Sequence, residues 1–136
     1  MNLPAQLAAL VRERAGGRCE YCRMAQSLQG GTFHLEHVVP QSRGGFSTAE
    51  NLALACPGCN LHKADRVSAI DPETGNEAPL FHPRANRWSA HFGWDGEHVV
   101  GKTATGRATL AVLQFNHPRR LRIRVAEAGF GLFPPD

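Results

Sequence analysis

Three side chains that bind metals or move protons stand close together in the stretch FHLEHVVP, residues 33–40: His34, Glu36 and His37. A carboxylate is a hard oxygen ligand of the kind that Mg²⁺ prefers. Histidine, whose unperturbed pKa is about 6.5, suits general-base catalysis near neutral pH. Neighbours in a regular strand point to opposite faces, so either the strand twists near Pro40 or His34 is the partner of Glu36. The sequence leaves both arrangements open.

Four cysteines flank this stretch as two CxxC pairs, Cys19 with Cys22 and Cys56 with Cys59. Two such knuckles are typical of a tetrahedral four-thiolate zinc site. The N-terminus lacks the apolar region of a secretory signal, so we expect a cytoplasmic protein whose thiols stay reduced. We predict a structural Zn²⁺, because four thiolates leave no open position for chemistry.

The elements that must position these side chains follow from local patterns. Helical spacing of leucines predicts a helix over residues 3–14, ended by a glycine pair. Apolar and β-branched residues predict strands over 32–39 and 52–55, joined by a glycine-containing loop over 41–51. The second knuckle should open a helix that continues to about residue 66. Zinc would then clamp the first strand to this helix.

The C-terminal half carries weaker signals. Residues 71–87 are rich in Pro, Asn, Gly and Glu and predict a connecting arm on the surface. Asp95-Gly96 predicts a hairpin turn, and Thr105 is placed to cap a helix beginning at Gly106. Pro118 should interrupt that helix.

An arginine cluster then follows, formed by Arg119, Arg120, Arg122 and Arg124. It either binds phosphates or forms the polar side of a last helix or strand. Similarly, Trp88, Phe92 and Trp94 either stack on bases or, as we expect, form the core of the hairpin. We predict an α+β fold with a zinc-stapled core over residues 1–70. The extension over 71–136 should pack on this core as part of one domain.

The combined pattern CEYC…FHLEHVVPQSRGG…ENLALACPGCNLHKADR resembles the HNH endonucleases that carry two zinc knuckles. The resemblance covers about residues 7–66. The matching positions are Glu36-His37, Pro40, Gly44-Gly45, Asn51-Leu52, Cys56, Cys59-Asn60 and Lys63. It implies a ββα-metal (His-Me) finger with an N-terminal helix, to which the C-terminal hairpin and helix are added.

The resemblance also implies roles for single residues. His37 would be the general base, and Asn51 would fix the long loop by hydrogen bonds. Glu36 and Asn60 would hold a catalytic Mg²⁺, Mn²⁺ or other divalent metal, with His34 as a possible further ligand. Candidates for contact with the nucleic-acid backbone are Arg43, Lys63 and Arg66.

Composition agrees with an anionic partner without requiring one. The net charge is only +3, but 13 of the 15 basic residues are Arg, which suits bidentate phosphate contacts. No apolar run approaches the roughly 20 residues of a membrane span. We predict a metal-dependent endonuclease acting on DNA. Two alternatives stay open, a zinc-stapled nucleic-acid-binding module without cleavage and a nuclease acting on RNA, and the oligomeric state is undetermined.

Overall fold

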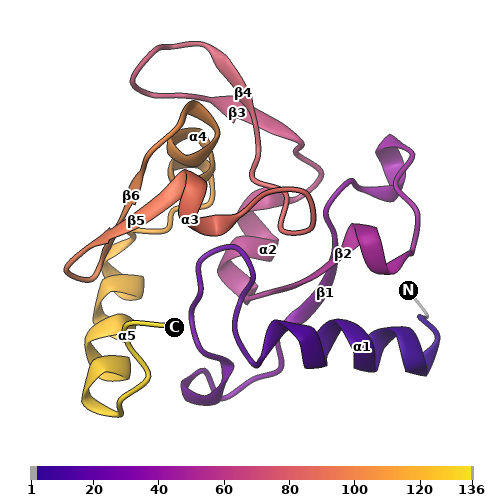
Figure 1. Ribbon diagram of the computed structural model, residues 1–136, viewed down its shortest axis with the longest axis horizontal. Helices are drawn as coiled ribbons and strands as arrows, with labels where there is room; N and C mark the ends of the chain where they lie inside the picture. Colours follow the sequence, from indigo (N-terminus) through magenta and orange to yellow (C-terminus); the bar gives the residue numbers. More distant parts are fainter. Residues whose placement is uncertain (1–2, 136) are drawn as a thin grey trace.

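The computed structural model describes residues 3–135, and its centre is a two-stranded antiparallel sheet with one helix on either side in the sequence (Figure 1). Helix α1, Ala5–Ala15, precedes strand β1, His34–His37, which pairs with β2, Leu52–Ala55. Helix α2, Pro57–Lys63, follows β2 directly. The predicted order of helix, strand, loop, strand and helix is therefore confirmed.

Local chemistry explains the ends of these elements. Helix α1 stops at Gly16, whose φ of 62° is a left-handed conformation that glycine adopts without strain. At the start of α2, the Sγ atom of Cys56 accepts a hydrogen bond from the amide of Cys59, and Pro57 occupies the first turn. Helix α2 ends at Lys63, about three residues earlier than predicted.

The loop between β1 and β2 contains two short 3₁₀ turns, Gln41–Arg43 and Ala49–Asn51. Another 3₁₀ turn, Gln26–Leu28, follows the first cysteine pair. All four residues of β2 are buried. This burial explains why β2 reads as a continuous apolar run rather than an alternating one.

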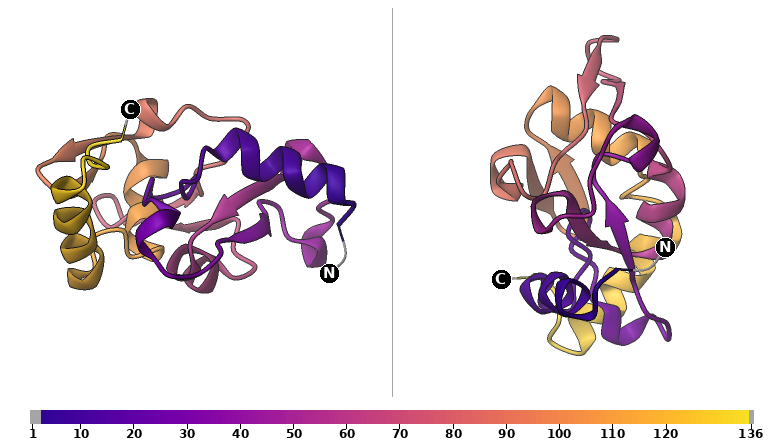
Figure 2. Two further views of the ribbon diagram at one scale, coloured as in Figure 1. Left: turned by 90° about the horizontal axis from the view of Figure 1, so that it is seen from below. Right: turned by 90° about the vertical axis from the view of Figure 1, so that its right-hand side faces the viewer.

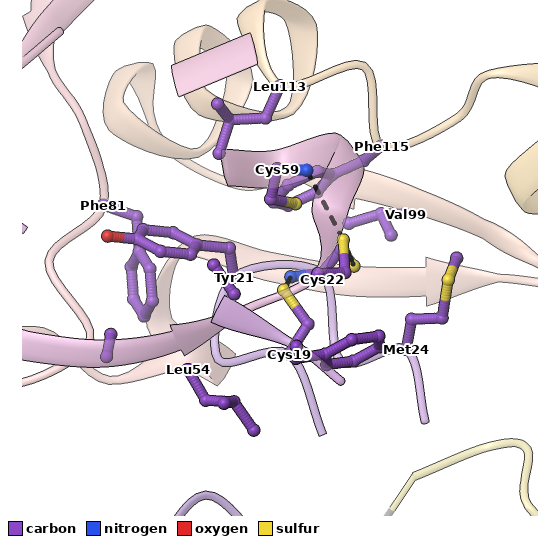
Figure 3. Packing of buried hydrophobic residues seen from close by; sticks show 14 of the residues in the cluster. Cys19, Tyr21, Cys22, Met24, Leu54, Cys59, Phe81, Val99, Leu113 and Phe115 are labelled. Atoms are coloured by element: carbon purple, nitrogen blue, oxygen red, sulfur yellow. Dashed lines mark hydrogen bonds between the residues drawn. The ribbon is translucent and has the colours of Figure 1, made fainter. Parts of the chain in front are cut away.

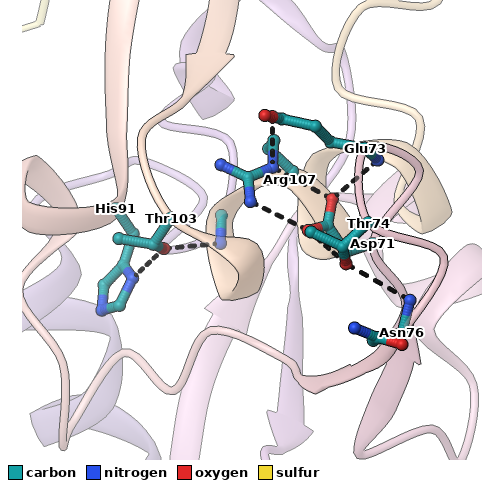
Figure 4. A network of polar contacts seen from close by, with 8 residues as sticks. Asp71, Glu73, Thr74, Asn76, His91, Thr103 and Arg107 are labelled. Carbon is teal, nitrogen blue, oxygen red and sulfur yellow. Dashed lines mark hydrogen bonds and ion pairs between the residues drawn. The ribbon is translucent and has the colours of Figure 1, made fainter.

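The prediction of an irregular surface arm over residues 71–87 is partly wrong. Strand β3, Ser68–Ile70, pairs with β4, Glu77–Pro79, so a hairpin stands where a loop was expected. The buried carboxylate of Asp71 organises its turn by accepting hydrogen bonds from the Glu73 amide and the Thr74 hydroxyl. Arg107 binds the same carboxylate through two nitrogens, at 3.0 and 2.9 Å (Figure 4). The sequence pattern missed this hairpin because a distant arginine holds its turn.

The remaining elements are a short helix, a hairpin and two further helices. They are α3, Trp88–His91; β5, Phe92–Asp95; β6, His98–Gly101; α4, Ala104–Val112; and α5, Pro118–Gly129. The predicted hairpin is confirmed. The predicted helix cap is wrong, because Thr103 rather than Thr105 accepts the capping hydrogen bond, from the amide of Gly106 (Figure 4). The predicted interruption by Pro118 is wrong, because α4 already ends at Val112 and Pro118 begins α5.

Both halves of the chain contribute to one hydrophobic core (Figure 3). Tyr21, Phe33 and Leu54 come from the first half, while Phe81 and Phe92 come from the second. Helix α5 lies at one end of the long axis and α1 towards the other (Figures 1 and 2). Within residues 3–135 no helix has the length and apolar character needed to cross a membrane.

The arginine cluster separates into two pairs on α5. Arg120 and Arg124 are one helical turn apart and buried, whereas Arg119 and Arg122 are exposed. Arg124 donates to the carbonyl oxygens of Phe115 and Glu97. Half of the cluster is thus part of the folded interior.

Candidate active site and zinc centre

The four cysteines come together in the core, two from the turn after α1 and two from the start of α2 (Figure 3). Their sulfur atoms all lie within 4.8 Å of one another, and the Sγ atoms of Cys22 and Cys56 are 3.7 Å apart. Sulfurs bonded to one tetrahedral zinc at about 2.3 Å lie roughly 3.8 Å apart, whereas a disulfide needs about 2.05 Å. The predicted cluster is confirmed, and its geometry is compatible with Zn²⁺.

Arg120 provides a positive charge beside this centre. Its Nη1 atom donates to Cys59 Sγ at 3.4 Å, and its side chain is buried. Burial opposes the charge, but negative charge on the sulfurs of Cys59, Cys22 and Cys56 outweighs it and raises the guanidinium pKa. A Cβ atom at Gly58 would overlap this guanidinium, so the glycine of the CPGC knuckle makes room for it. The C-terminal helix is therefore in direct contact with the cysteine cluster.

Glu36 lies near the end of β1 with its carboxylate 7% exposed. Its Oε1 atom is 2.6 Å from the Nζ atom of Lys63, and its Oε2 atom accepts a hydrogen bond from the Tyr21 hydroxyl at 2.6 Å. Burial raises the pKa of Glu36, while Lys63 and Tyr21 oppose that rise. Burial and the nearby carboxylate raise the pKa of Tyr21, which keeps its hydroxyl a donor. Both carboxylate oxygens thus face a donor or a cation.

Lys63 connects α2 to β1. Its side chain is only 1% exposed, and Nζ also donates to the backbone carbonyl of His37 at 3.3 Å. A buried lysine is rare unless it is paired, and here the pair is Glu36. The predicted contact of Lys63 with phosphate stays a prediction. In the structure its ammonium contacts Glu36 and the His37 carbonyl instead.

His37 ends β1 and is half-buried. Its Nε2 atom lies 2.8 Å from the Oγ atom of Ser47 in the loop. Burial and, to a lesser degree, the charge of Lys63 lower the pKa of the imidazole. The ring is therefore held in place and favoured in its neutral form.

Asn51 holds the loop closed over the end of β1. Its Oδ1 atom accepts from the Val39 amide at 2.8 Å, and its Nδ2 atom donates to the carbonyls of Val39 and Phe46 at 2.9 Å each. A Cβ atom at Gly45 would overlap the Val39 carbonyl, and Gly44 has a φ of 87°. Each glycine of the pair is thus required, one for close approach and one for its left-handed backbone.

The other predicted site residues are more dispersed. Asn60 is half-buried on α2, and among residues 3–135 its side-chain amide has no hydrogen-bond partner. His34 is exposed and lines a hollow against α1 rather than the Glu36 carboxylate. Arg43 and Arg66 are exposed, and their Nε atoms donate to the carbonyls of Asp65 and His62.

Comparison with protein families identifies the region that contains these residues. Residues 19–66 match the family model described as HNH endonuclease, and they run from the first knuckle to just beyond α2. This region is an HNH domain. Searches among curated proteins and among solved structures gave no match. A match to the HNH family over this region indicates nuclease activity in general.

A catalytic metal in the HNH domain would need ligands beyond the cysteines. Within the described chain, the four cysteines are the one group of three or more His, Cys, Asp or Glu close enough to share an ion. Glu36 and Asn60 offer the oxygen donors that Mg²⁺ or Mn²⁺ prefers. Within residues 3–135, the partner of the buried Oε1 atom of Glu36 is the Lys63 ammonium at 2.6 Å, and a carboxylate oxygen has more than one lone pair. However, a cation at this oxygen would lie against the Lys63 ammonium. The donors fit a divalent metal only with that ammonium displaced.

Sequence reasoning missed three contributors to this site. Tyr21 lies within the first CxxC pair, where only the cysteines drew attention, and Ser47 looked like an ordinary loop residue. The ion pair of Lys63 was missed because the residue was considered only as a surface cation. The available signal was the spacing of Asn60 and Lys63, three residues apart on α2, which places the two side chains on one side of the helix.

Proposed function

We propose that the protein is an endonuclease that hydrolyses phosphodiester bonds in DNA, with His37 as the general base. The observation that carries this proposal is the position of His37 in the HNH domain. The imidazole stands at the end of β1, next to Glu36, and Ser47 holds its Nε2 atom at 2.8 Å. Asn51 fixes the loop that carries Ser47.

The two ring nitrogens of His37 would have separate tasks. When Nε2–H donates to Ser47, Nδ1 is left as an acceptor for the proton of an attacking water. The lowered imidazole pKa keeps this nitrogen unprotonated near neutral pH. Ser47 would therefore orient the base, and His37 would take up the proton.

The same model assigns the remaining residues. A divalent cation held by Glu36 and Asn60 would polarise the phosphate and stabilise the leaving oxygen. To admit it, Lys63 would withdraw its ammonium from Glu36. Arg43 and Arg66, both exposed near the end of α2, would contact the DNA backbone.

The direct test is cleavage of supercoiled plasmid by the zinc-loaded protein with added Mg²⁺ or Mn²⁺. We expect nicked or linear product with the wild type and none with His37→Ala. His98→Ala is the matched control, because His98 is exposed on β6 outside the HNH domain. Equal cleavage by His37→Ala would show that His37 is not the general base. Intact plasmid in every divalent metal, alongside cleaved RNA, would support the RNA nuclease alternative instead.

One observation favours the second candidate, a zinc-stapled binding module without cleavage. The charge of Glu36 is already balanced by Lys63, so this site is complete without a metal. In that case the protein would bind DNA or RNA but leave both intact across divalent metals. Binding can be followed by electrophoretic mobility, with the same His37→Ala and His98→Ala proteins as controls.

A further inference from the structure

A cavity of about 620 Å³ lies where the first cysteine knuckle meets the C-terminal extension, outside the set of residues assigned to hydrolysis. We call it the tryptophan cavity. Its lining includes Trp88, Trp94, Arg23, Arg87 and Lys102. The volume is in the range of pockets that hold small organic ligands.

The charge of the tryptophan cavity is of one sign. Arg23, Arg87 and Lys102 are its charged lining residues, and no Asp or Glu is among the described residues that line it. Arg87 and Lys102 are exposed, and neither forms an ion pair within residues 3–135. The electrostatic complement of this lining is an anion.

Aromatic rings form the other part of the wall. The centroids of Trp88 and Trp94 are 5.3 Å apart, and the Arg23 guanidinium lies 5.6 Å from the Trp88 centroid. Both tryptophans keep part of their surface exposed. Indole surface beside cations is the combination that binds nucleobases together with their phosphates.

The backbone of Arg23 adds an independent indication. This residue follows the CEYC knuckle and has a φ of 68°, a conformation that glycine adopts freely and arginine rarely does. A long charged side chain therefore occupies a position that backbone geometry alone would give to glycine. Its guanidinium reaches the Trp88 ring and the cavity.

We propose that the tryptophan cavity binds an unpaired nucleotide of the nucleic-acid substrate, with the base against Trp88 and Trp94 and the phosphate on the three cations. This inference rests on the proposed nuclease function. Tyr21 connects the cavity to the hydrolytic site, because Trp88 Nε1 donates to its carbonyl at 2.8 Å and its hydroxyl donates to Glu36. Single-stranded or locally opened nucleic acid is thus the substrate class, since paired bases are not free to enter.

The chain offers a direct probe, because its two tryptophans both line the cavity. Zinc-loaded full-length protein is titrated, without added Mg²⁺ or Mn²⁺, with a single-stranded oligonucleotide, the corresponding duplex and inorganic polyphosphate. Tryptophan fluorescence reports on the cavity, and the anisotropy of labelled oligonucleotide reports on total binding. We expect quenching by the single strand and much weaker quenching by the duplex or polyphosphate.

Three variants test the cations. Arg87→Gln and Lys102→Gln should each weaken single-strand binding and lower the slope of log affinity against log salt by about one. Arg12→Gln removes the same charge from an exposed position on α1 that does not line the cavity, and should leave both unchanged. Thermal melts confirm that the variants are folded, which the exposure of the three side chains leads us to expect.

Several results would overturn the inference. These are binding seen by anisotropy without any tryptophan response, an equal response to polyphosphate, or an equal loss in Arg12→Gln. Cleavage assays separate this failure from that of the proposed function. Plasmid cleavage without a tryptophan response would refute nucleotide binding in the cavity but not the nuclease function. Quenching without cleavage in any divalent metal would refute the nuclease function but not nucleotide binding in the cavity.

Discussion

Replacing Lys63 with methionine tests the central ion pair of the site. The substitution keeps an unbranched apolar side chain, one atom shorter, but leaves the Glu36 carboxylate, 7% exposed, without its cation at 2.6 Å. Removing one partner of a buried pair typically costs about 3–5 kcal/mol, because the remaining charge is unpaired. We expect a loss of this size in the free energy of unfolding, measured by urea denaturation of zinc-loaded protein without other divalent ions.

A double-mutant cycle assigns this loss to the pair. Glu36→Gln combined with Lys63→Met removes both charges, so the double variant should be more stable than the sum of the single losses predicts. Lys102→Met is the matched control, since Lys102 is the other lysine of the chain and is exposed. It should change stability by no more than about 0.5 kcal/mol. A Lys63→Met loss as small as that of the control would refute the ion pair.

The same variant tests competition between Lys63 and a metal. With the ammonium gone, a divalent cation can neutralise Glu36 without displacing another charge. Mg²⁺ or Mn²⁺ at about 100 times its dissociation constant stabilises a folded protein by about 2.7 kcal/mol. We therefore expect a given concentration of metal to raise the melting temperature more in Lys63→Met than in the wild type. An equal rise in the two proteins would show that Lys63 does not exclude the metal.

Three further predictions concern residues outside this pair. Arg120→Met should lower the affinity for Zn²⁺ by about 10- to 100-fold in chelator competition, because the cation beside Cys59 is lost, and Gly58→Ala should have a similar effect by pushing Arg120 away. Gly45→Ala should abolish cleavage but keep zinc, because a Cβ there overlaps the Val39 carbonyl and opens the loop around His37. The pKa of Asp71 is lowered, chiefly by its hydrogen bonds to Arg107, so the carboxylate stabilises the fold above its unfolded pKa of about 3.9, and the stabilisation is lost as pH falls towards the lower folded value. Asp71→Asn should thus melt below the wild type at pH 7, and this difference should shrink below about pH 4; a gap that stays constant across this range would contradict the assignment.

Local signals predicted the parts of the fold whose causes are local. Strand β2 was placed correctly at 52–55, because four apolar residues between a loop and a cysteine knuckle leave little choice. The hairpin of β5 and β6 was found from a turn signal. By contrast, the hairpin of β3 and β4 depends on Arg107, which is 36 residues from Asp71. No residue close to Asp71 in the sequence indicates that contact.

The site shows the same division. Spacing brought out the four cysteines, and the family pattern brought out Glu36, His37, Asn51 and Asn60. Neither indicated that the Glu36 carboxylate is bound by Lys63 and Tyr21. The direction of a side chain within a knuckle or a short helix depends on packing. The contact of Arg120 with Cys59 could not be predicted for a similar reason, because it depends on the position of α5 relative to the cysteine cluster.

The contacts that α5 and α3 make with the two cysteine knuckles and with Ala25 have a consequence for the modularity of the HNH domain. Glu127 accepts a hydrogen bond from the amide of Ala25, Arg120 from the same helix reaches Cys59, and Trp88 donates to the carbonyl of Tyr21. A fragment cut at residue 70 would lose all three and would expose the aromatic side of the core. In this protein the HNH domain is therefore not a transplantable unit, and transferring it to another scaffold would require its C-terminal helices as well.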